Sequence, residues 1–464
     1  MPKSLSLCLS EEKMQKWGRK KKNQLSLLFV LFLCFFVLFK ITILSNGGIT
    51  RSRGDDDPHS NSNSNPNPSS LPTYLTSNAS TPRVANRVLG ASDWSKACTT
   101  IQSYKRRAAV AAEDGRQHES KSDGCNLFSG RWVYDNRSYP LYEELDCPYM
   151  SDQLACRKHG RPDRDYQSWR WQPDSCELKR WNATEMLEKL RGKRLMFAGD
   201  SLNRGQWISM VCLVQSAIPA GKKSMTPNAG LTKFMAEEYN ASIEFYWAPL
   251  IVESNSDDPI NHRLDERKIR PDSLLKHAAE WANADILIFN SYLWWRSGNK
   301  IKLVWSSSEE DICEEADGID AMKLALETWA GWVSTSVDPQ KQQVFFVTMS
   351  PTHLWSREWN PGSDGNCYDE RAPIDDEGYW GSGSDVETMH AVAAIMAKLG
   401  RKITVLNITQ LSEYRKDGHP SIYRKFWEAL TPRQLANPAS YADCIHWCLP
   451  GVPDVWNELL FNSL

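Results

Sequence analysis

The stretch RLMFAGDSLNRGQW at 194–207 constrains the fold of this chain more than any other. It begins with a short apolar run that predicts a buried strand, turns sharply at GDS, and continues as a predicted helix over 202–214. A serine at such a turn lies at the carboxyl end of a sheet, where N–H groups of the following helix can stabilise an oxyanion. We therefore predict that Ser201 is a nucleophile. The alternative is a serine that only caps the helix.

A base for this serine is expected near the other end of the chain. The tetrapeptide DCIH at 443–446 places a carboxylate three residues before an imidazole. The carboxylate can accept a hydrogen bond from Nδ1–H, which leaves Nε2 free to take the serine proton. Asp56 and His59 have the same spacing, but their surroundings have the composition of a disordered segment. The predicted triad is Ser201, Asp443 and His446.

Short apolar runs alternate with amphipathic helical patterns through the second half of the chain. This alternation predicts a three-layer α/β/α sandwich with a mainly parallel sheet. The carboxyl ends of parallel strands share one edge, so the residues that follow them should meet there. The predicted strands are 194–198, 242–248, 285–290, 343–349 and 402–406, and the clearest helices are 319–334 and 385–399.

Longer matches make a family resemblance specific. Beyond GDSLNRGQW, they are CNLFSGRWVYDN from Cys125, NSYLWW at 290–295, YRKDGHPSIY at 414–423 and DCIHWCLPGVPDVWN at 443–457. Over residues 122–464 the chain resembles the plant trichome-birefringence-like family of polysaccharide O-acetyltransferases, whose fold is of the SGNH/GDSL-hydrolase type. The motifs are too long to match by chance.

The resemblance implies a Golgi enzyme that transfers acetyl groups to a cell-wall polysaccharide, with xylan as the first expectation. Ser201, activated by His446, would form an acetyl-serine, and a sugar hydroxyl would then receive the acetyl group. No phosphate-binding motif identifies the donor, so acetyl-CoA is the default co-substrate and no bound cofactor is expected. Two alternatives stay open: a polysaccharide acetylesterase with the same triad, and a non-catalytic protein that binds wall glycans such as pectin.

Several residues beside the triad are expected to support it. Gly199 and Asp200 form the turn, and Asp200 is expected to cap the helix. The resemblance implies that the Asn290 side chain donates to the oxyanion together with the Ser201 N–H. Arg204 and Gln206 lie one helical turn past the nucleophile and match the family motif, so we expect them to bind the acceptor or brace the site.

Tryptophan and histidine are frequent near these motifs. Flat indoles suit stacking against sugar rings, although tryptophan is as often a core residue. Trp294 and Trp355 lie among these motif tryptophans. Those expected to bind substrate are Trp295, Trp359 and Trp447. His353 and His419 could each be a buried, hydrogen-bonded histidine, and for His419 we favour that structural role.

The first part of the chain predicts a membrane anchor. Residues 1–24 carry seven Lys or Arg against two Glu, and the apolar run 25–45 that follows is long enough to span a bilayer. The positive-inside rule then places residues 1–24 in the cytosol and the body in the lumen, as in a single-pass type II Golgi protein. A cleaved signal peptide is the alternative, but the run is long for one and no clear cleavage site follows.

The remaining sequence divides by composition. Residues 46–121 are rich in Ser, Asn and Pro and predict a mostly disordered stem. A catalytic body follows at 122–464, with a cysteine-rich segment at 122–180 wrapped on an esterase-like core at 181–464. The formal charge is −2 overall and +5 for residues 1–24, so the rest carries −7. This mildly acidic charge gives no sign of a nucleic-acid partner and argues against a polyanionic substrate.

Ten cysteines lie beyond the apolar run, and an even number in a luminal body indicates disulfides. A zinc site is the alternative, but no pair has the CxxC spacing of a zinc ribbon, so we expect no metal. The resemblance implies four bridges among Cys125, Cys147, Cys156, Cys176, Cys212, Cys367, Cys444 and Cys448. Cys98 and Cys313 have no assigned role. Sequons that fit a luminal body are at Asn78, Asn136, Asn182, Asn240 and Asn407.

Overall fold

The computed structural model describes residues 125–464, except 229, 297, 299 and 306–311. The expected membrane anchor, the stem, Asn78 and Cys98 lie outside the described residues, and so does the side chain of Cys313. Within the part that the structure describes, no helix is both long and apolar enough to cross a membrane.

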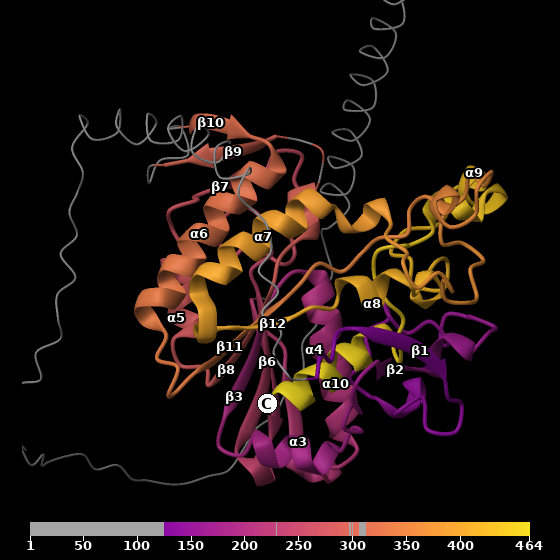
Figure 1. Ribbon diagram of the computed structural model, residues 1–464, viewed down its shortest axis with the longest axis horizontal. Helices are drawn as coiled ribbons and strands as arrows, with labels where there is room; N and C mark the ends of the chain where they lie inside the picture. Colours follow the sequence, from indigo (N-terminus) through magenta and orange to yellow (C-terminus); the bar gives the residue numbers. More distant parts are fainter. Residues whose placement is uncertain (1–124, 229, 297, 299, 306–311) are drawn as a thin grey trace, which may run out of the picture. The chain divides into compact units, whose positions relative to one another are not determined.

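A seven-stranded sheet forms the centre of the body, in the order β12-β11-β8-β3-β6-β5-β4 (Figure 1). The strands from β12 to β6 are parallel, and β5 and β4 join at one edge in antiparallel pairing. The parallel strands are the ones predicted from the apolar runs. Their bounds are β3 Arg194–Gly199, β6 Ala241–Trp247, β8 Ile286–Asn290, β11 Gln343–Val347 and β12 Thr404–Leu406; the antiparallel strands are β4 Lys223–Thr226 and β5 Leu231–Ala236.

Helices cover both faces of this sheet, which confirms the predicted three-layer fold (Figure 1). Alternate residues of β3 point into different cores, because successive side chains of a strand point to opposite faces. Leu195 and Phe197 pack with one set of helices, and Met196 and Ala198 pack with the other. The first set is α3 Ala183–Lys189, α4 Ser201–Gln215 and α10 Val452–Ser463; the second is α5 Leu275–Trp281, α6 Gly318–Ser336 and α7 Val386–Leu399.

Smaller elements complete the body. A second sheet has the order β10-β9-β7, and β1 and β2 pair antiparallel at the start of the described chain. Their bounds are β1 Gly130–Tyr134, β2 Trp169–Pro173, β7 Lys268–Ile269, β9 Ile301–Val304 and β10 Ile312–Ala316; two short helices are α8 Thr409–Glu413 and α9 Pro432–Ala436.

The topology places the nucleophile where doubly wound sheets bind ligands. β6 lies on one side of β3, whereas β8, β11 and β12 follow on the other side. The strand order therefore reverses at β3, and a crevice forms outside the carboxyl ends of the strands at such a switch point. Ser201 follows β3 at this position.

Eight cysteines form four disulfides, as the resemblance implied. They are Cys125–Cys176, Cys147–Cys212, Cys156–Cys448 and Cys367–Cys444. Cys147 and Cys156 tie the N-terminal segment to α4 and to the loop before α10. The Trp132 indole N–H adds a hydrogen bond of 2.7 Å to the Leu411 carbonyl. The cysteine-rich segment is thus fastened to the core.

The four described sequon asparagines, Asn136, Asn182, Asn240 and Asn407, are all exposed. Each side chain can therefore carry a glycan without disturbing the core. The Asn182 side chain also accepts a hydrogen bond from the Glu185 N–H at the start of α3.

The disulfides predict the thiol content of the protein. The chain has 12 cysteines, and four bridges use eight, which leaves 12 − 8 = 4. Thiol titration of the denatured, unreduced full-length protein should find no more than four free groups. Breaking one native bridge should lower the free energy of unfolding by about 2–5 kcal/mol. Eight or more free thiols would contradict the bridged structure.

Candidate active site

Ser201 is the first residue of α4, and Asp200 is the N-cap. The Asp200 carboxylate accepts a hydrogen bond of 2.9 Å from the Leu202 N–H, which confirms the expected capping role. Burial raises the pKa of Asp200 to about 6, against the opposing backbone hydrogen bonds from Leu202 and Asn203. The cap fixes the direction in which α4 leaves the sheet and so the position of Ser201.

Gly199 is required by the close approach of β3 and β8. A Cβ atom at this position would lie 2.1 Å from the Asn290 carbonyl oxygen, which is backbone and cannot move aside. A side chain here would force the two strands apart directly beneath the nucleophile. The glycine of the Gly-Asp-Ser turn therefore has a packing role.

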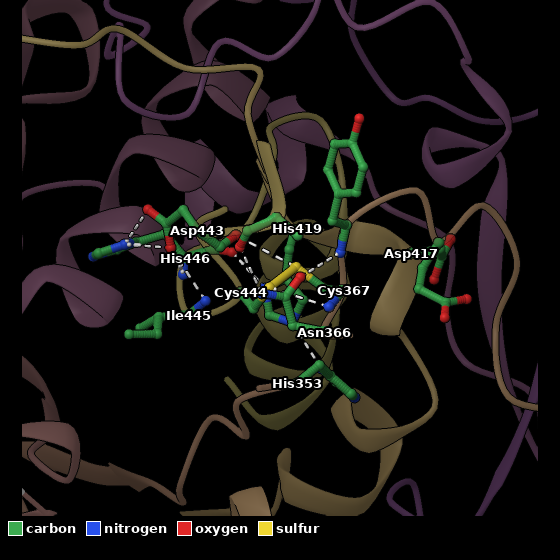
Figure 2. Close-up of a disulfide and its surroundings, with 12 residues drawn as sticks. His353, Asn366, Cys367, Asp417, His419, Asp443, Cys444, Ile445 and His446 are labelled. Carbon is green, nitrogen blue, oxygen red and sulfur yellow. Dashed lines mark hydrogen bonds and ion pairs between the residues drawn. A yellow bond between two sulfur atoms is a disulfide. The ribbon is translucent and has the colours of Figure 1, made fainter. Parts of the chain in front are cut away.

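The structure brings the predicted triad together. His446 Nε2 lies 2.9 Å from Ser201 Oγ and accepts its hydroxyl proton, while Nδ1–H donates to Asp443 Oδ2 at 2.9 Å. Asp443 Oδ1 also accepts the backbone N–H groups of Ile445 at 3.1 Å and His446 at 3.0 Å. Figure 2 shows His446 and Asp443 side by side, with the hydrogen bonds that Asp443 accepts. This arrangement can deprotonate Ser201 for attack on an acyl carbon.

Nearby charges determine the direction in which the pKa of the catalytic base, His446, is shifted. Burial disfavours the charged imidazole, but the charge of Asp443 and its hydrogen bond outweigh burial and raise the pKa of His446 above its ordinary value. In turn, burial of Asp443 is outweighed mainly by His446, so the pKa of this carboxyl stays well below its usual range. Arg424 Nε lies 3.6 Å from Asp443 Oδ2 and favours the ionised carboxylate as well. Asp443 is therefore an anion that stabilises the imidazolium formed during acyl transfer.

The loop that carries His446 is fastened on both sides. Cys444 is bridged to Cys367 and Cys448 to Cys156, as expected for bridges that fix the base. The Nδ1–H of buried His419 donates to the His446 carbonyl at 2.7 Å (Figure 2). These links hold the imidazole in place although the loop has little regular secondary structure.

His419 has the structural role that we favoured. Its ring stacks on Trp447, with centroids 4.1 Å apart, and its Nε2 lies 2.7 Å from His353 Nδ1. His353 Nε2 lies 2.8 Å from the Glu413 carbonyl oxygen. Burial is the largest cause that lowers the pKa of both histidines, to about 4 for His353. Both rings brace the loop behind the triad.

The structure contradicts the oxyanion role expected for Asn290. Its side-chain amide donates to the carbonyls of Val347 and Thr348, both at 3.1 Å, so both amide hydrogens are engaged at the end of β11. Asn290 thus braces the ends of β8 and β11. The Ser201 N–H at the start of α4 stays our predicted oxyanion donor.

Ser201 and His446 open into a cavity of about 720 Å³. Arg204 lines this cavity with them, whereas Gln206 is buried and its carbonyl accepts a hydrogen bond from Asn457. Arg204 is therefore placed to meet substrate, and Gln206 to brace α4 against α10. Among residues 125–464, gaps excepted, no group of three or more His, Cys, Asp or Glu side chains could hold a metal ion.

Of the motif tryptophans, Trp294 lines the cavity, whereas the three expected to bind substrate do not. Trp295 and Trp447 are only 3% and 2% exposed, and their indoles donate to Ser291 and Ser350 in the core. They offer no face to a sugar, so both predictions were wrong. Trp359 lies away from the cavity, with its ring edge against His353. The lining tryptophans are Trp247, Trp294 and Trp427.

Gln153 is a site residue that the sequence did not reveal. It lies in the N-terminal segment, lines the cavity, and places its amide nitrogen 3.4 Å from His446 Nδ1 and 3.5 Å from Nε2. A single glutamine outside every motif carries no local signal. The bridge from Cys156, three residues along the chain, to Cys448 and the hydrogen bond from the Leu449 N–H to the Leu154 carbonyl hold this segment beside the triad.

Two family models match the body. The GDSL/SGNH-like acyl-esterase family found in Pmr5 and Cas1p matches residues 178–463, and the PMR5 N-terminal domain matches residues 123–177. Together they extend over almost all of the described residues.

Similar proteins match along most of the chain. Protein trichome birefringence-like 35 of Arabidopsis thaliana is 56% identical over 464 residues, which cover 97% of this chain and 100% of that protein. Probable xylan O-acetyltransferase 10 of Oryza sativa subsp. japonica is 53% identical over 344 residues, with 74% and 78% covered. Xylan O-acetyltransferase 14 of the same species is 50% identical over 365 residues, with 73% and 77% covered.

The triad predicts a graded loss of acyl transfer. Ser201→Ala should abolish turnover and any acetyl adduct, and His446→Ala should cost a similar factor, because nucleophile and base act as one unit. Asp443→Asn should slow turnover by about 10⁴, as for the equivalent change in a serine protease. Rates with an activated acetyl ester and the intact mass of the enzyme measure both effects. Near wild-type turnover by Ser201→Ala would exclude the covalent route.

The raised pKa of His446 predicts the acid limb of the pH profile. A general base must be unprotonated, so activity should rise with pH through a pKa above the ordinary histidine value of about 6.5. Asp443→Asn removes the charge that raises this pKa, and the residual activity should show the limb at lower pH. The measurement is kcat/KM against pH for both proteins, and an unmoved limb would show that another group controls it.

Proposed function

The chain belongs to the trichome-birefringence-like family of GDSL/SGNH-like acyl-esterase proteins, and we propose that it transfers acetyl groups to a cell-wall polysaccharide, with xylan as the acceptor. One observation carries the chemistry: Ser201, His446 and Asp443 form a continuous hydrogen-bonded chain that opens into a cavity of about 720 Å³. The acceptor is proposed because similar rice proteins are xylan O-acetyltransferases.

The first half-reaction transfers the acetyl group from the donor to Ser201. His446 Nε2 takes the proton of Ser201 Oγ as the oxygen attacks the carbonyl carbon of the acetyl donor. Asp443 stabilises the imidazolium, and the Ser201 N–H faces the developing oxyanion. The tetrahedral intermediate collapses, His446 protonates the leaving group, and acetyl remains on Ser201.

The second half-reaction transfers the acetyl group from Ser201 to a sugar hydroxyl. His446 Nε2 takes the proton of an acceptor hydroxyl, whose oxygen attacks the acetyl-serine carbonyl. The new ester leaves with the sugar, and the proton returns to Ser201 Oγ. Water in place of the hydroxyl would release acetate, so the same residues also support hydrolysis. Transfer requires that bound glycan excludes water at this step.

The walls of the cavity suit a glycan. Trp247, Trp294 and Trp427 line it together with Phe245, and Trp427 is 75% exposed. Aromatic rings offer flat apolar faces for the C–H faces of a sugar. An exposed indole in the cavity that holds Ser201 is a place for a glycan chain to stack, and this favours a polysaccharide as the substrate.

The donor and the cellular location complete the proposal. We propose acetyl-CoA as the donor and the Golgi lumen as the location, with a single-pass anchor at residues 25–45. Four bridges and exposed sequon asparagines fit an oxidising compartment with N-glycosylation. The thiol titration also tests this placement, because a chain with all cysteines reduced would not come from the lumen.

Acetyl transfer can be separated from hydrolysis in one experiment. The full-length protein is incubated with acetyl-CoA and unacetylated xylan, glucomannan or pectin oligosaccharides, and the products are identified by mass. We expect acetylated xylan oligosaccharides, an acetyl adduct on Ser201, and neither with Ser201→Ala. Acetate released at equal rates with and without glycan would identify an esterase and reject the transferase.

A further inference from the structure

Three arginines line the active-site cavity: Arg204, Arg263 and Arg267. Among the described residues, none of the three forms an ion pair with a carboxylate, whereas several buried or half-buried arginines of the body do. Arg194, for example, bonds Glu244 at 2.8 Å, and Arg415 bonds Asp417 at the same distance.

Arg204 is the one nearest the nucleophile along the chain, three residues after Ser201 on α4. Residues three apart lie on the same face of a helix, and both line the cavity. Burial lowers the pKa of Arg204, and within the described residues its guanidinium has one long contact, of 3.5 Å, with Ser151 Oγ. A partly desolvated cation without a counter-ion is costly, so this position favours an anion supplied by a ligand.

Arg267 is held in place by its surroundings. It donates to the Trp294 carbonyl, and its guanidinium lies 4.6 Å from the centre of the Trp294 ring. Burial lowers the pKa of Arg267 too. Its contacts with a carbonyl and an indole orient the group, and in the part of the chain that the structure describes no anion balances its charge.

The rest of the lining does not balance this charge. Arg263 is exposed, and so is Asp265, the one carboxylate among the described lining residues. Burial lowers the pKa of the lining His262, and the charge of Arg263 adds to this effect, so His262 is neutral at pH 7. The lining therefore carries 3 − 1 = +2 within a body whose sequence charge beyond residue 24 is −7.

We propose that this cavity binds a substrate that carries an anionic group, a carboxylate or a phosphate, through Arg263, Arg267 and Arg204. The proposal rests on the acetyl-transfer function and specifies its substrates, since an uncharged pentose chain gives these arginines no anionic partner. A uronic-acid side group on the acceptor would supply a carboxylate, and acetyl-CoA would supply phosphates. Arginine suits both, because its planar fork can bind two oxygens at once.

A single anionic group bound inside the cavity is a different case from a polyanionic substrate, which the net negative charge of the body disfavours. Charges beyond the Debye length of about 8 Å at physiological salt are largely screened, so the acidic body does not prevent binding of an anion inside the cavity. The lining residues, and not the net charge of the chain, decide this specificity.

The test compares charged and neutral substrates on the full-length protein. Donors are acetyl-CoA and the neutral 4-nitrophenyl acetate; acceptors are xylo-oligosaccharides with and without a glucuronic-acid side group. Variants are Arg263→Gln, Arg267→Gln and the charge-retaining Arg267→Lys. The matched control is Arg270→Gln, which lies outside the cavity lining and pairs with Glu253 at 3.3 Å.

We expect KM for at least one anionic substrate to rise about tenfold or more in each Gln variant, as for loss of a charged hydrogen bond. Arg267→Lys should recover part of this loss, and Arg270→Gln should match wild type. In Arg263→Gln, kinetics with the neutral donor and neutral acceptor should change little, and in the wild type KM for the anionic substrate should rise with salt. If KM rises only for acetyl-CoA, the arginines bind the donor. If KM rises only for the glucuronic-acid oligosaccharide, the arginines bind the acceptor.

Direct binding separates this inference from the proposed function. Calorimetry on Ser201→Ala measures affinity for coenzyme A and for both oligosaccharides without turnover, and Arg263→Gln is added in the same background. Binding of an anionic ligand that is weakened about tenfold or more by Arg263→Gln supports the site even if no acetyl transfer occurs. Unchanged affinity and unchanged KM for both anionic substrates would overturn it.

Discussion

The hydrogen bond between Ser201 Oγ and His446 Nε2 joins two positions that are 245 residues apart in the sequence. Ser201 is easy to position, because it lies between a buried strand and a capped helix. His446 lies on a loop with little regular structure, so its position must come from tertiary links. The bridges at Cys444 and Cys448 and the hydrogen bond from His419 supply them. The catalytic geometry depends on how firmly this loop is held.

The N-terminal segment is part of that support and not an appendage. Arg161 donates to the carbonyls of Asp417 at 2.7 Å and His419 at 2.8 Å, directly behind the His446 loop. Cys156 bridges to Cys448 from the same segment, and Gln153 reaches the His446 ring. The family models divide the chain at residue 177, but the active site draws on both sides of that boundary. The two parts therefore form one catalytic unit.

The sequence predicted what local pattern and motif determine. The apolar runs in the sequence directly indicate the buried parallel strands. The spacing of Asp443 and His446 predicts the hydrogen bond between their side chains. The roles of Asn290 and Trp447 were wrong because a side chain's neighbours decide whether it faces a core or a cavity. The β4–β5 edge pair was missed because β4 is short and mostly polar and the apolar residues of β5 do not alternate with polar ones. Gln153 was missed because a single residue carries no periodic signal. Such features arise only from long-range packing.

Charge is distributed unequally around the reacting atoms. Asp443 and, more weakly, Asp200 favour the imidazolium of His446, whereas Arg424 opposes it. The arginines in the cavity lining are positively charged and therefore favour a negative charge on a substrate. Because the triad is shared by esterases and transferases, the triad alone does not select the acceptor. Selection must come from the cavity, where aromatic faces and unpaired guanidinium groups meet beside one activated serine.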